Sequence, residues 1–263
     1  MNWIASLPMY NVTPALAADW RAFLADVLRE AAPLTRIVEA DESLDTFWRR
    51  ADLLISQTCG YPLMHGLREH VQLIATPEFD APGCVGPNYS SVIVTRAGGP
   101  VQSLEASRGL RVAFNQPDSN SGMNALRHAI APLSRDGSFF GEAVVTGSHV
   151  GSLTAIAENR ADIAAIDCVT MAFVRDGLPR LARAVREVAW TQASPGLPLV
   201  ASNNVDASTI AALRSALDNA LHADPGRTKR LRLKGFSTLS LTDYARIEQL
   251  ENEALTFGYT HLA

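Results

Sequence analysis

The sequence has little of what marks several large classes of protein. Its 263 residues include three cysteines, 7% aromatic residues and 19% charged residues. No apolar run reaches the roughly 18 residues that a membrane-spanning helix needs, and three cysteines without dense spacing make no disulfide framework. With 47% hydrophobic residues, the chain has the composition of a globular protein long enough for one large domain or two small ones.

Charge and short motifs exclude further classes. The formal net charge is −4, and the densest basic segment, residues 227–234, is interpreted as solvated surface, so nucleic acid is not expected as a partner. The chain contains no GxGxxG, no GxxxxGK[ST] and no His or Cys pair at metal-ligand spacing. We therefore expect neither a cofactor nor a metal.

The N-terminal segment MNWIASLPMYNVTPALAADW lacks the basic start and the uninterrupted apolar stretch of a signal peptide. This pattern predicts either a cytoplasmic chain or the mature portion of an exported one. The cysteines leave the same choice open: Cys59 and Cys84 pair and leave Cys168 over, or all three stay reduced.

Strand-like and helix-like segments alternate along the chain, which predicts an α/β fold with largely parallel sheets. Thr13 and Pro14 mark the start of an amphipathic helix that extends to about Ala31. Strands are predicted at residues 3–7, 35–38, 52–56, 71–76, 90–95, 111–115, 143–146, 163–166, 185–190 and 199–202, and later helices at 207–223 and 242–257.

Two turn-rich breaks divide this series. The first, residues 97–100, and the second, residues 193–198, bracket a central α/β block. We therefore predict two lobes: residues 1–95 together with 193–263, and residues 96–192, with the two crossing segments acting as a hinge.

Four junctions share one design, in which an apolar strand runs into small and polar residues and then a helix. In open α/β sheets, ligands bind beyond the carboxyl ends of the strands, where helix N-termini converge. The four junctions are LLISQTCGYP (53–62), RVAFNQPDSNSG (111–122), AVVTGSHVGS (143–152) and IAAIDCVT (163–170).

The second junction is the strongest candidate for an anion site. Its end, residues 115–122, is here called the Ser-rich turn, and it offers Asn115, Ser119, Asn120 and Ser121 just before a helix predicted to start near Gly122. Unpaired N–H groups and hydroxyls at a helix start bind anions. One helix cap would need only one such residue, and no Lys or Arg lies between Asn115 and Leu126, so neutral dipoles would hold the anion.

The other junctions supply further candidates. His149 either donates to an oxyanion or lies in a turn as a surface or capping residue. Asp167 either caps a helix, accepts a hydrogen bond from a P–OH group or pairs with an amine elsewhere on the ligand. Tyr10 and Tyr61 follow strand ends and would add phenol groups or core contacts. Cys59, beside Gly60, is a candidate nucleophile, although its motif matches no known cysteine hydrolase.

Longer motifs show a resemblance that covers most of the chain. They are SLPMY, DLLISQTCGYPL, GCVGPNYSSVIVTR, SLEASRGLRVAFNQPDSNSGMNALR, VTGSHVGSLTAIAENRADIAAID, LRLKGFSTLSLTDY and the closing GY. Together they resemble the phosphate/phosphite/phosphonate substrate-binding proteins of ABC transporters, the PhnD-like group of type 2 periplasmic binding proteins. The resemblance implies two α/β lobes, each a mainly parallel sheet flanked by helices, joined by two hinge crossovers.

The resemblance also implies roles for the candidate residues. The family holds phosphonate oxygens at the Ser-rich turn, which corresponds to Ser119, Asn120 and Ser121 here. A histidine, an acidic residue and an early tyrosine of the family correspond to His149, Asp167 and Tyr61, and Tyr10 occupies a plausible aromatic position after the first strand.

The function expected from these observations is capture of a small phosphorus oxyanion or organophosphonate between two lobes, for ABC-type uptake with a transporter permease as partner. The expected mechanism is hinge closure without covalent chemistry, so the chain is not expected to be an enzyme. Two alternatives stay open: a cytosolic enzyme on the same fold, using Cys59, Cys168 and His149, and a ligand sensor.

Overall fold

The computed structural model describes residues 2–263, which form two compact units. Unit 1 contains residues up to Asp80, Val85–Pro87 and Pro195–Tyr244. Unit 2 contains Ala81–Cys84, Asn88–Ser194 and Ala245–Ala263. Each unit is therefore built from three separate stretches of the chain.

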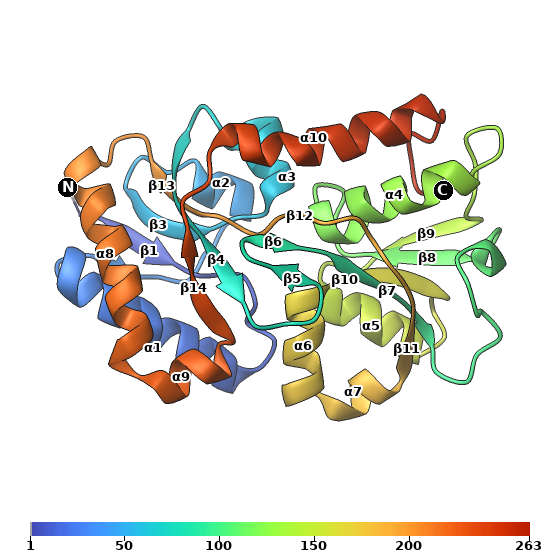
Figure 1. The fold of residues 1–263 in the computed structure, drawn as a ribbon, viewed down its shortest axis with the longest axis horizontal. Helices are drawn as coiled ribbons and strands as arrows, with labels where there is room; N and C mark the ends of the chain where they lie inside the picture. The colour runs from blue at the N-terminus through green and yellow to red at the C-terminus, as the bar shows by residue number, and fades with distance from the viewer. Residues whose placement is uncertain (1) are drawn as a thin grey trace. The chain divides into compact units, whose positions relative to one another are not determined.

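Unit 1 is built around a six-stranded sheet with the order β14-β4-β13-β3-β1-β2 (Figure 1). The pairs β1–β2 and β1–β3 are parallel, whereas β13 runs antiparallel to both of its neighbours and β14 runs antiparallel to β4. The carboxyl ends of β1, β3 and β4 therefore lie along the same edge. The strands are β1 (Ile4–Ser6), β2 (Arg36–Ile37), β3 (Leu53–Gln57), β4 (Val71–Phe79), β13 (Leu199–Ser202) and β14 (Leu233–Ser237).

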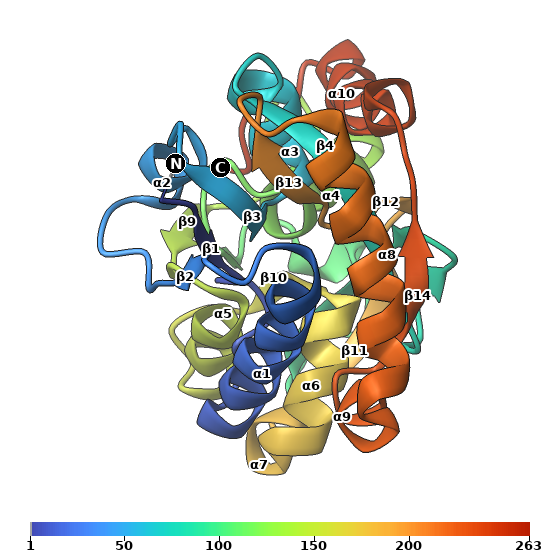
Figure 2. The ribbon, with the colours of Figure 1, turned by 90° about the vertical axis from the view of Figure 1, so that its left-hand side faces the viewer.

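Helix α1 (Pro14–Ala31) begins where the sequence predicts, because the Thr13 side chain accepts a hydrogen bond from the Leu16 N–H. It lies beside α8 (Ala207–Ala223), and the two are seen together in Figure 2. Its buried face is rich in aromatic and branched residues, as expected of an amphipathic helix on a sheet. The other helices of unit 1 are α2 (Leu44–Trp48), α3 (Gly60–Pro62), the π-helix η1 (Leu63–Leu67) and α9 (Pro225–Arg230).

Unit 2 contains a five-stranded sheet with the order β11-β7-β10-β8-β9. Strands β8, β9 and β10 are mutually parallel, whereas β7 runs antiparallel to β10 and β11. The loops that follow β8, β9 and β10 therefore leave the sheet at one edge. The strands are β7 (Ser91–Arg96), β8 (Arg111–Phe114), β9 (Glu142–Val145), β10 (Ile163–Asp167) and β11 (Val185–Trp190).

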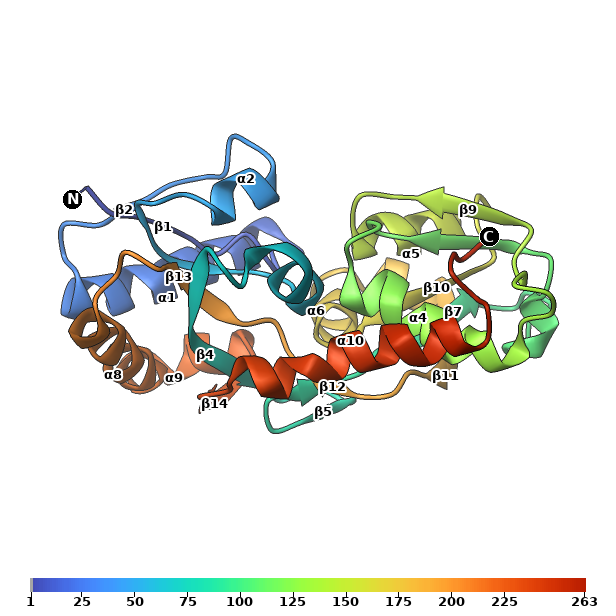
Figure 3. The ribbon, with the colours of Figure 1, turned by 90° about the horizontal axis from the view of Figure 1, so that it is seen from above.

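The helical elements of unit 2 follow these strands. The C-terminal helix α10 (Leu241–Thr256) runs beside α4 in unit 2 (Figure 3), and Ala254, Tyr259 and Leu262 enter the unit's core with Phe139 and Phe140. The elements are η2 (Glu105–Ser107), the π-helix η3 (Asn120–Asn124), α4 (Ala125–Ile130), η4 (Ala131–Leu133), α5 (His149–Ala157), α6 (Cys168–Gly177) and α7 (Pro179–Arg183).

Short strands mark the places where the chain passes between units. They are β5 (Cys84–Val85), β6 (Asn88–Tyr89) and β12 (Ser194–Pro195), and they form a sheet with the order β12-β6-β5. The strands β7 and β13 follow directly after these passages, and both are antiparallel to their neighbours. A strand that enters a sheet without a crossover helix is free to take this direction.

The α/β fold with helix-flanked sheets is confirmed, but the units do not have the predicted bounds of 1–95 plus 193–263 and 96–192. Strand β7 precedes the Gly/Pro break at 97–100, yet it pairs with β10 and β11 and so belongs to unit 2. The segment 245–263 also belongs to unit 2, because its apolar side chains pack into that core. Over residues 2–263, no helix combines the length and apolar character required to cross a membrane.

Candidate functional site

The Ser-rich turn follows β8 at the edge where the three parallel strands of unit 2 end. Ser119 caps the π-helix η3, since its Oγ accepts a hydrogen bond from the Gly122 N–H at 3.0 Å. Its carbonyl accepts from the Asn124 N–H at 3.0 Å. The helix therefore begins two residues before Gly122, as a π turn that leads into α4. π turns are rare in proteins, and those that occur are often found at functional sites.

Ser121 and His149 bring two junctions together. The Ser121 Oγ lies 2.9 Å from the His149 Nε2, and the Ser121 carbonyl accepts a hydrogen bond from the Ser91 Oγ at 2.9 Å. His149 is the first residue of α5, after the Ser148 cap. The hydroxyl of the Ser-rich turn and the imidazole of the following junction are thus neighbours, as the sequence predicts for the ends of parallel strands.

The imidazole of His149 is uncharged at neutral pH. Burial lowers its pKa from 6.5 to about 4, and the nearby backbone of Ala165 offsets part of this effect. Its Nδ1 is buried. The residue as a whole remains half-buried.

Close packing holds the turn against His149. A Cβ on Gly122 would lie 2.0 Å from the Asn115 Oδ1 and 3.2 Å from the His149 Cε1, so this position has room only for glycine. The Asn115 carbonyl accepts a hydrogen bond from the Gly147 N–H at 2.9 Å, which ties the loop after β8 to the loop after β9.

Asn120 faces the interior of unit 2. Its Nδ2 donates to the Tyr89 Oη at 3.1 Å and to the Ser194 Oγ at 2.8 Å, and its Oδ1 accepts from the Asn124 Nδ2 at 3.2 Å. The side-chain amide of Asn120 therefore stabilises the turn through these hydrogen bonds. The sequence identifies Asn120 as a site residue but not its partners Tyr89 and Ser194, which lie far along the chain.

Asn124 extends this support to the C-terminal helix. Its Nδ2 also donates to the Ile247 carbonyl at 3.0 Å, and its Oδ1 accepts from the Arg127 Nη2 at 2.9 Å. Arg127 is 5% exposed and forms an ion pair with Glu251 at 2.8 Å. The first arginine after the turn is therefore committed to α10.

Asp167 ends β10 and caps α6. Its Oδ1 accepts hydrogen bonds from the Val169 N–H at 2.7 Å and the Thr170 N–H at 3.1 Å. It pairs in the β-ladder with Ser91, whose hydroxyl bonds the Ser121 carbonyl. The carboxylate thus lies at the same sheet edge as the Ser-rich turn, and its capping role is the one that the sequence offered as the alternative.

The remaining candidates lie in unit 1, where β1 and β3 end at one edge. Tyr10 has a positive φ of 66° and is 8% exposed, with its ring edge-on to Phe79 at 5.3 Å. Tyr61 lies in α3, just before the π-helix η1, and its ring centre is 4.1 Å from that of His65. Cys59 precedes α3 and is 9% exposed.

The cysteines are reduced in the structure, and the sulfur atoms that approach one another are not the pair suggested by the sequence. The Cys84 and Cys168 Sγ atoms lie 3.5 Å apart, both in unit 2, whereas Cys59 belongs to unit 1. Among the described residues, no group of three or more His, Cys, Asp or Glu side chains is arranged to hold a metal ion.

Comparison with known families gives this arrangement a context. The family model described as "ABC transporter, phosphonate, periplasmic substrate-binding protein" matches residues 49–244. The chain belongs to this family. The match includes all four junctions and the Ser-rich turn, and the family is one of transport substrate-binding proteins.

Solved structures agree on the fold. A binding protein component of an ABC phosphonate transporter from Pseudomonas aeruginosa has a TM-score of 0.79 at 19% identity, covering 97% of this chain and 87% of that chain. PhnD1 from Prochlorococcus marinus, in complex with methylphosphonate, has a TM-score of 0.77 at 16% identity, covering 96% and 97%. The alkanesulfonate-binding protein SsuA from Xanthomonas axonopodis pv. citri, bound to MOPS, has a TM-score of 0.67 at 14% identity, covering 98% and 94%. No curated protein matches the chain.

Proposed function

We propose that this protein captures a small phosphorus oxyanion or organophosphonate at the Ser-rich turn and delivers it to an ABC transporter permease. Membership of the phosphonate-binding family supports the ligand class, as does the methylphosphonate complex of the similar PhnD1. The remaining donors would come from unit 1, with Tyr61 and Tyr10 as the candidates, after hinge closure.

The observation that carries the proposal is the 2.9 Å contact between the Ser121 Oγ and the His149 Nε2. With its proton on Nε2, the neutral imidazole donates to Ser121 and leaves the hydroxyl hydrogen for an ionised P–O⁻ oxygen. With its proton on Nδ1, the imidazole accepts from Ser121, whose oxygen then accepts from a P–OH group. The pair therefore suits an anion that exists in both protonation states near neutral pH.

Asp167 supports a phosphorus ligand over a sulfur ligand. A carboxylate at the same sheet edge repels a fully deprotonated oxyanion but accepts a hydrogen bond from P–OH. A sulfonate has no such proton. We therefore propose selectivity for phosphonates, in contrast to the MOPS complex of the alkanesulfonate-binding protein with the same fold.

The test is calorimetric titration of methylphosphonate into the wild type, Ser121→Ala and Ser215→Ala. Loss of the Ser121 hydroxyl should weaken binding by about 1–3 kcal/mol, or roughly 5- to 150-fold. Ser215 is an exposed serine of α8 in unit 1, so its variant should bind like the wild type. Equal affinity of all three proteins would place the site elsewhere.

A further inference from the structure

Two of the three cysteines lie together in unit 2, and neither is among the residues proposed to bind the ligand. Cys84 is half-buried on β5, and Cys168 is 1% exposed at the start of α6, with their Sγ atoms 3.5 Å apart. The two residues are separated by 84 positions in the sequence. Their contact is therefore a product of the fold rather than of local chain geometry.

Backbone hydrogen bonds hold the two cysteine-bearing segments in place. The Gly83 carbonyl accepts from the Ser90 N–H at 3.0 Å, and the Ser90 carbonyl accepts from the Cys168 N–H at 3.2 Å. The backbone of Ser90 thus links Gly83, next to Cys84, to Cys168 by two hydrogen bonds. The Cys84 N–H also donates to the Ala81 carbonyl at 3.0 Å, which closes a tight turn at this point.

Side-chain packing adds a second constraint. A Cβ on Gly83 would lie 3.1 Å from the Cys168 Cβ and 3.2 Å from its Sγ, so the backbone of the Cys84 segment lies directly on the Cys168 side chain. The same Cβ would also collide with the Trp190 ring. Gly83 has a positive φ of 96°, which further favours glycine here.

We propose that Cys84 and Cys168 are a dithiol pair that is modified to an intramolecular disulfide by exchange with a small or protein disulfide. The Cys84 thiolate, which is the more exposed, attacks one sulfur of the oxidant disulfide and releases the other as a thiol. The Cys168 sulfur then loses its proton and attacks the Cys84 Sγ, releasing the second thiol. One S–S bond breaks, one forms, and the oxidant takes up both protons and both electrons.

The order of attack follows from the environment of the two sulfurs. The Cys84 side chain, burial and the Asp167 carboxylate together raise the pKa of the Cys168 thiol, so it is a poor first nucleophile. Exchange should therefore be slow at neutral pH and faster as the pH rises. The resulting cross-link would join β5, where the chain passes between units, to the residue after Asp167.

The experiment uses the purified full chain with oxidised glutathione, followed by alkylation, trypsin digestion and mass spectrometry. Each cysteine lies on its own tryptic peptide: residues 51–68 carry Cys59, residues 69–96 carry Cys84, and residues 161–175 carry Cys168. The expected product is a linked pair of peptides 69–96 and 161–175, with Cys59 alkylated. The linked pair should disappear in Cys84→Ser and Cys168→Ser and persist in Cys59→Ser.

Thermal unfolding provides a second readout. Closing a long loop constrains the unfolded chain, so oxidation should raise the melting temperature of the wild type and of Cys59→Ser by several degrees, but not that of Cys84→Ser. Three results would overturn the proposal: a Cys59–Cys84 linkage, a stable mixed disulfide of Cys84 with glutathione while Cys168 stays reduced, or no loss of thiols.

Discussion

At the scale of single residues, the Ser121 hydroxyl and the His149 imidazole form an uncharged pair at the end of the parallel strands of unit 2. Neutral donors bind an anion through directed hydrogen bonds, and they release it without separating opposite full charges. This is the behaviour required of a protein that must hand its ligand to a transporter. The absence of Lys and Arg from residues 115–126 fits the same requirement.

The Asp167 carboxylate should determine selectivity between phosphonates and sulfonates. Asp167→Asn keeps an oxygen that caps α6 but removes the negative charge. We expect the preference for methylphosphonate over methanesulfonate to fall about tenfold, which corresponds to about 1.4 kcal/mol. Calorimetric titration of both ligands measures this ratio, with Asp218→Asn on the exposed face of α8 as the control. An unchanged ratio would remove Asp167 from the proposed site.

His149 should make the stability of the fold depend on pH. Its pKa is lowered from 6.5 to about 4 in the folded chain, so between these values the unfolded chain binds a proton that the folded chain does not. The free energy of unfolding should therefore be unaffected above pH 6.5 and should decrease by roughly 1 kcal/mol per pH unit as the pH falls toward 4. Urea unfolding at several pH values measures this decrease.

The matched variant is His149→Gln, which has no titrating ring. Carboxylates elsewhere in the chain also lose stabilising contacts in acid. The informative quantity is therefore the difference in the free energy of unfolding between the wild type and His149→Gln at each pH. The free energy of unfolding of the wild type should fall relative to that of His149→Gln as the pH falls from 6.5 to 4. Parallel pH profiles would contradict the assignment of a buried, neutral imidazole.

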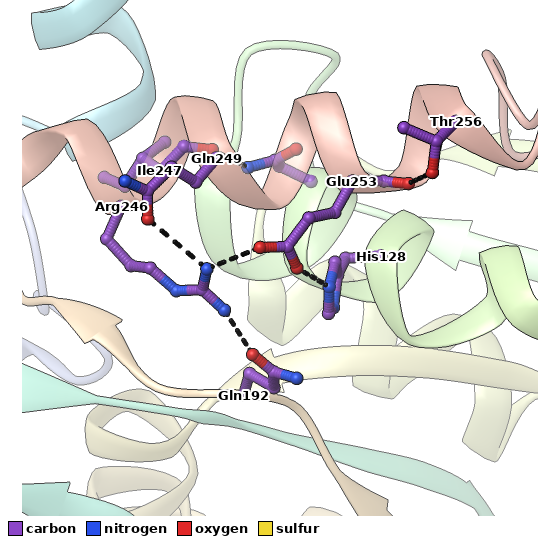
Figure 4. A network of polar contacts seen from close by, with 8 residues as sticks. His128, Gln192, Arg246, Ile247, Gln249, Glu253 and Thr256 are labelled. Atoms are coloured by element: carbon purple, nitrogen blue, oxygen red, sulfur yellow. Dashed lines mark hydrogen bonds and ion pairs between the residues drawn. The ribbon is translucent and has the colours of Figure 1, made fainter.

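At the scale of elements, α10 is held to α4 by two polar contacts of different kinds, the Arg127–Glu251 ion pair and the His128–Glu253 hydrogen bond. Arg127 and Glu251 are largely buried, with side-chain exposures of 6% and 16%. Glu253 instead bonds His128 at 2.7 Å and Arg246 at 2.8 Å and is 46% exposed (Figure 4). Gln192 and Gln249 also contact Arg246, which makes this second network an exposed polar patch.

We expect Glu251→Gln to lower the free energy of unfolding by about 2–4 kcal/mol, because it leaves the buried Arg127 without its charged partner. Glu253→Gln, two residues along the same helix, should cost less than about 1 kcal/mol, because water screens the exposed Arg246–Glu253 ion pair. Chemical denaturation of the two variants measures both values. Equal losses would show that burial does not separate the two pairs.

The sequence predicts several elements closely, since strong local patterns define them. The Thr13–Pro14 start of α1 and the strand Val185–Trp190 are found at the predicted residues. Strand β14 (Leu233–Ser237) is not predicted, because its sequence LKGFS contains lysine and glycine and is only partly buried. The sheet, rather than local propensity, determines this strand.

In the candidate site, too, local sequence reveals some features, whereas contacts between distant residues determine the others. The hydroxyls of the Ser-rich turn and the imidazole of His149 are visible in the sequence, since chemistry and strand ends locate them. The inward direction of Asn120 is not, because its partners Tyr89 and Ser194 lie 31 and 74 residues away. The proximity of Cys84 to Cys168 depends likewise on a strand passage that spacing alone does not reveal.

At the scale of the whole molecule, the chain end is an integral part of unit 2. Residues 245–263 bring Ala254, Tyr259 and Leu262 into its core, and the Tyr259 hydroxyl donates to the Leu262 carbonyl. Deleting this segment should destabilise unit 2 by more than about 5 kcal/mol, the cost of emptying two large core positions. Circular-dichroism melting should show loss of a cooperative transition, whereas deletion of the exposed Ala263 alone should have no effect. An unchanged melting curve after the larger deletion would contradict this role.

The π turn at Asn120–Asn124 has a consequence for inheritance. A π turn holds one residue more than the corresponding α turn, so deletion of one codon here would convert η3 into a continuation of α4. The residues before the deletion would rotate by about 100° around the helix axis and carry Ser121 away from His149. A descendant with an intact helix and no Ser121–His149 contact is therefore a single codon deletion away, and a single codon insertion would reverse it.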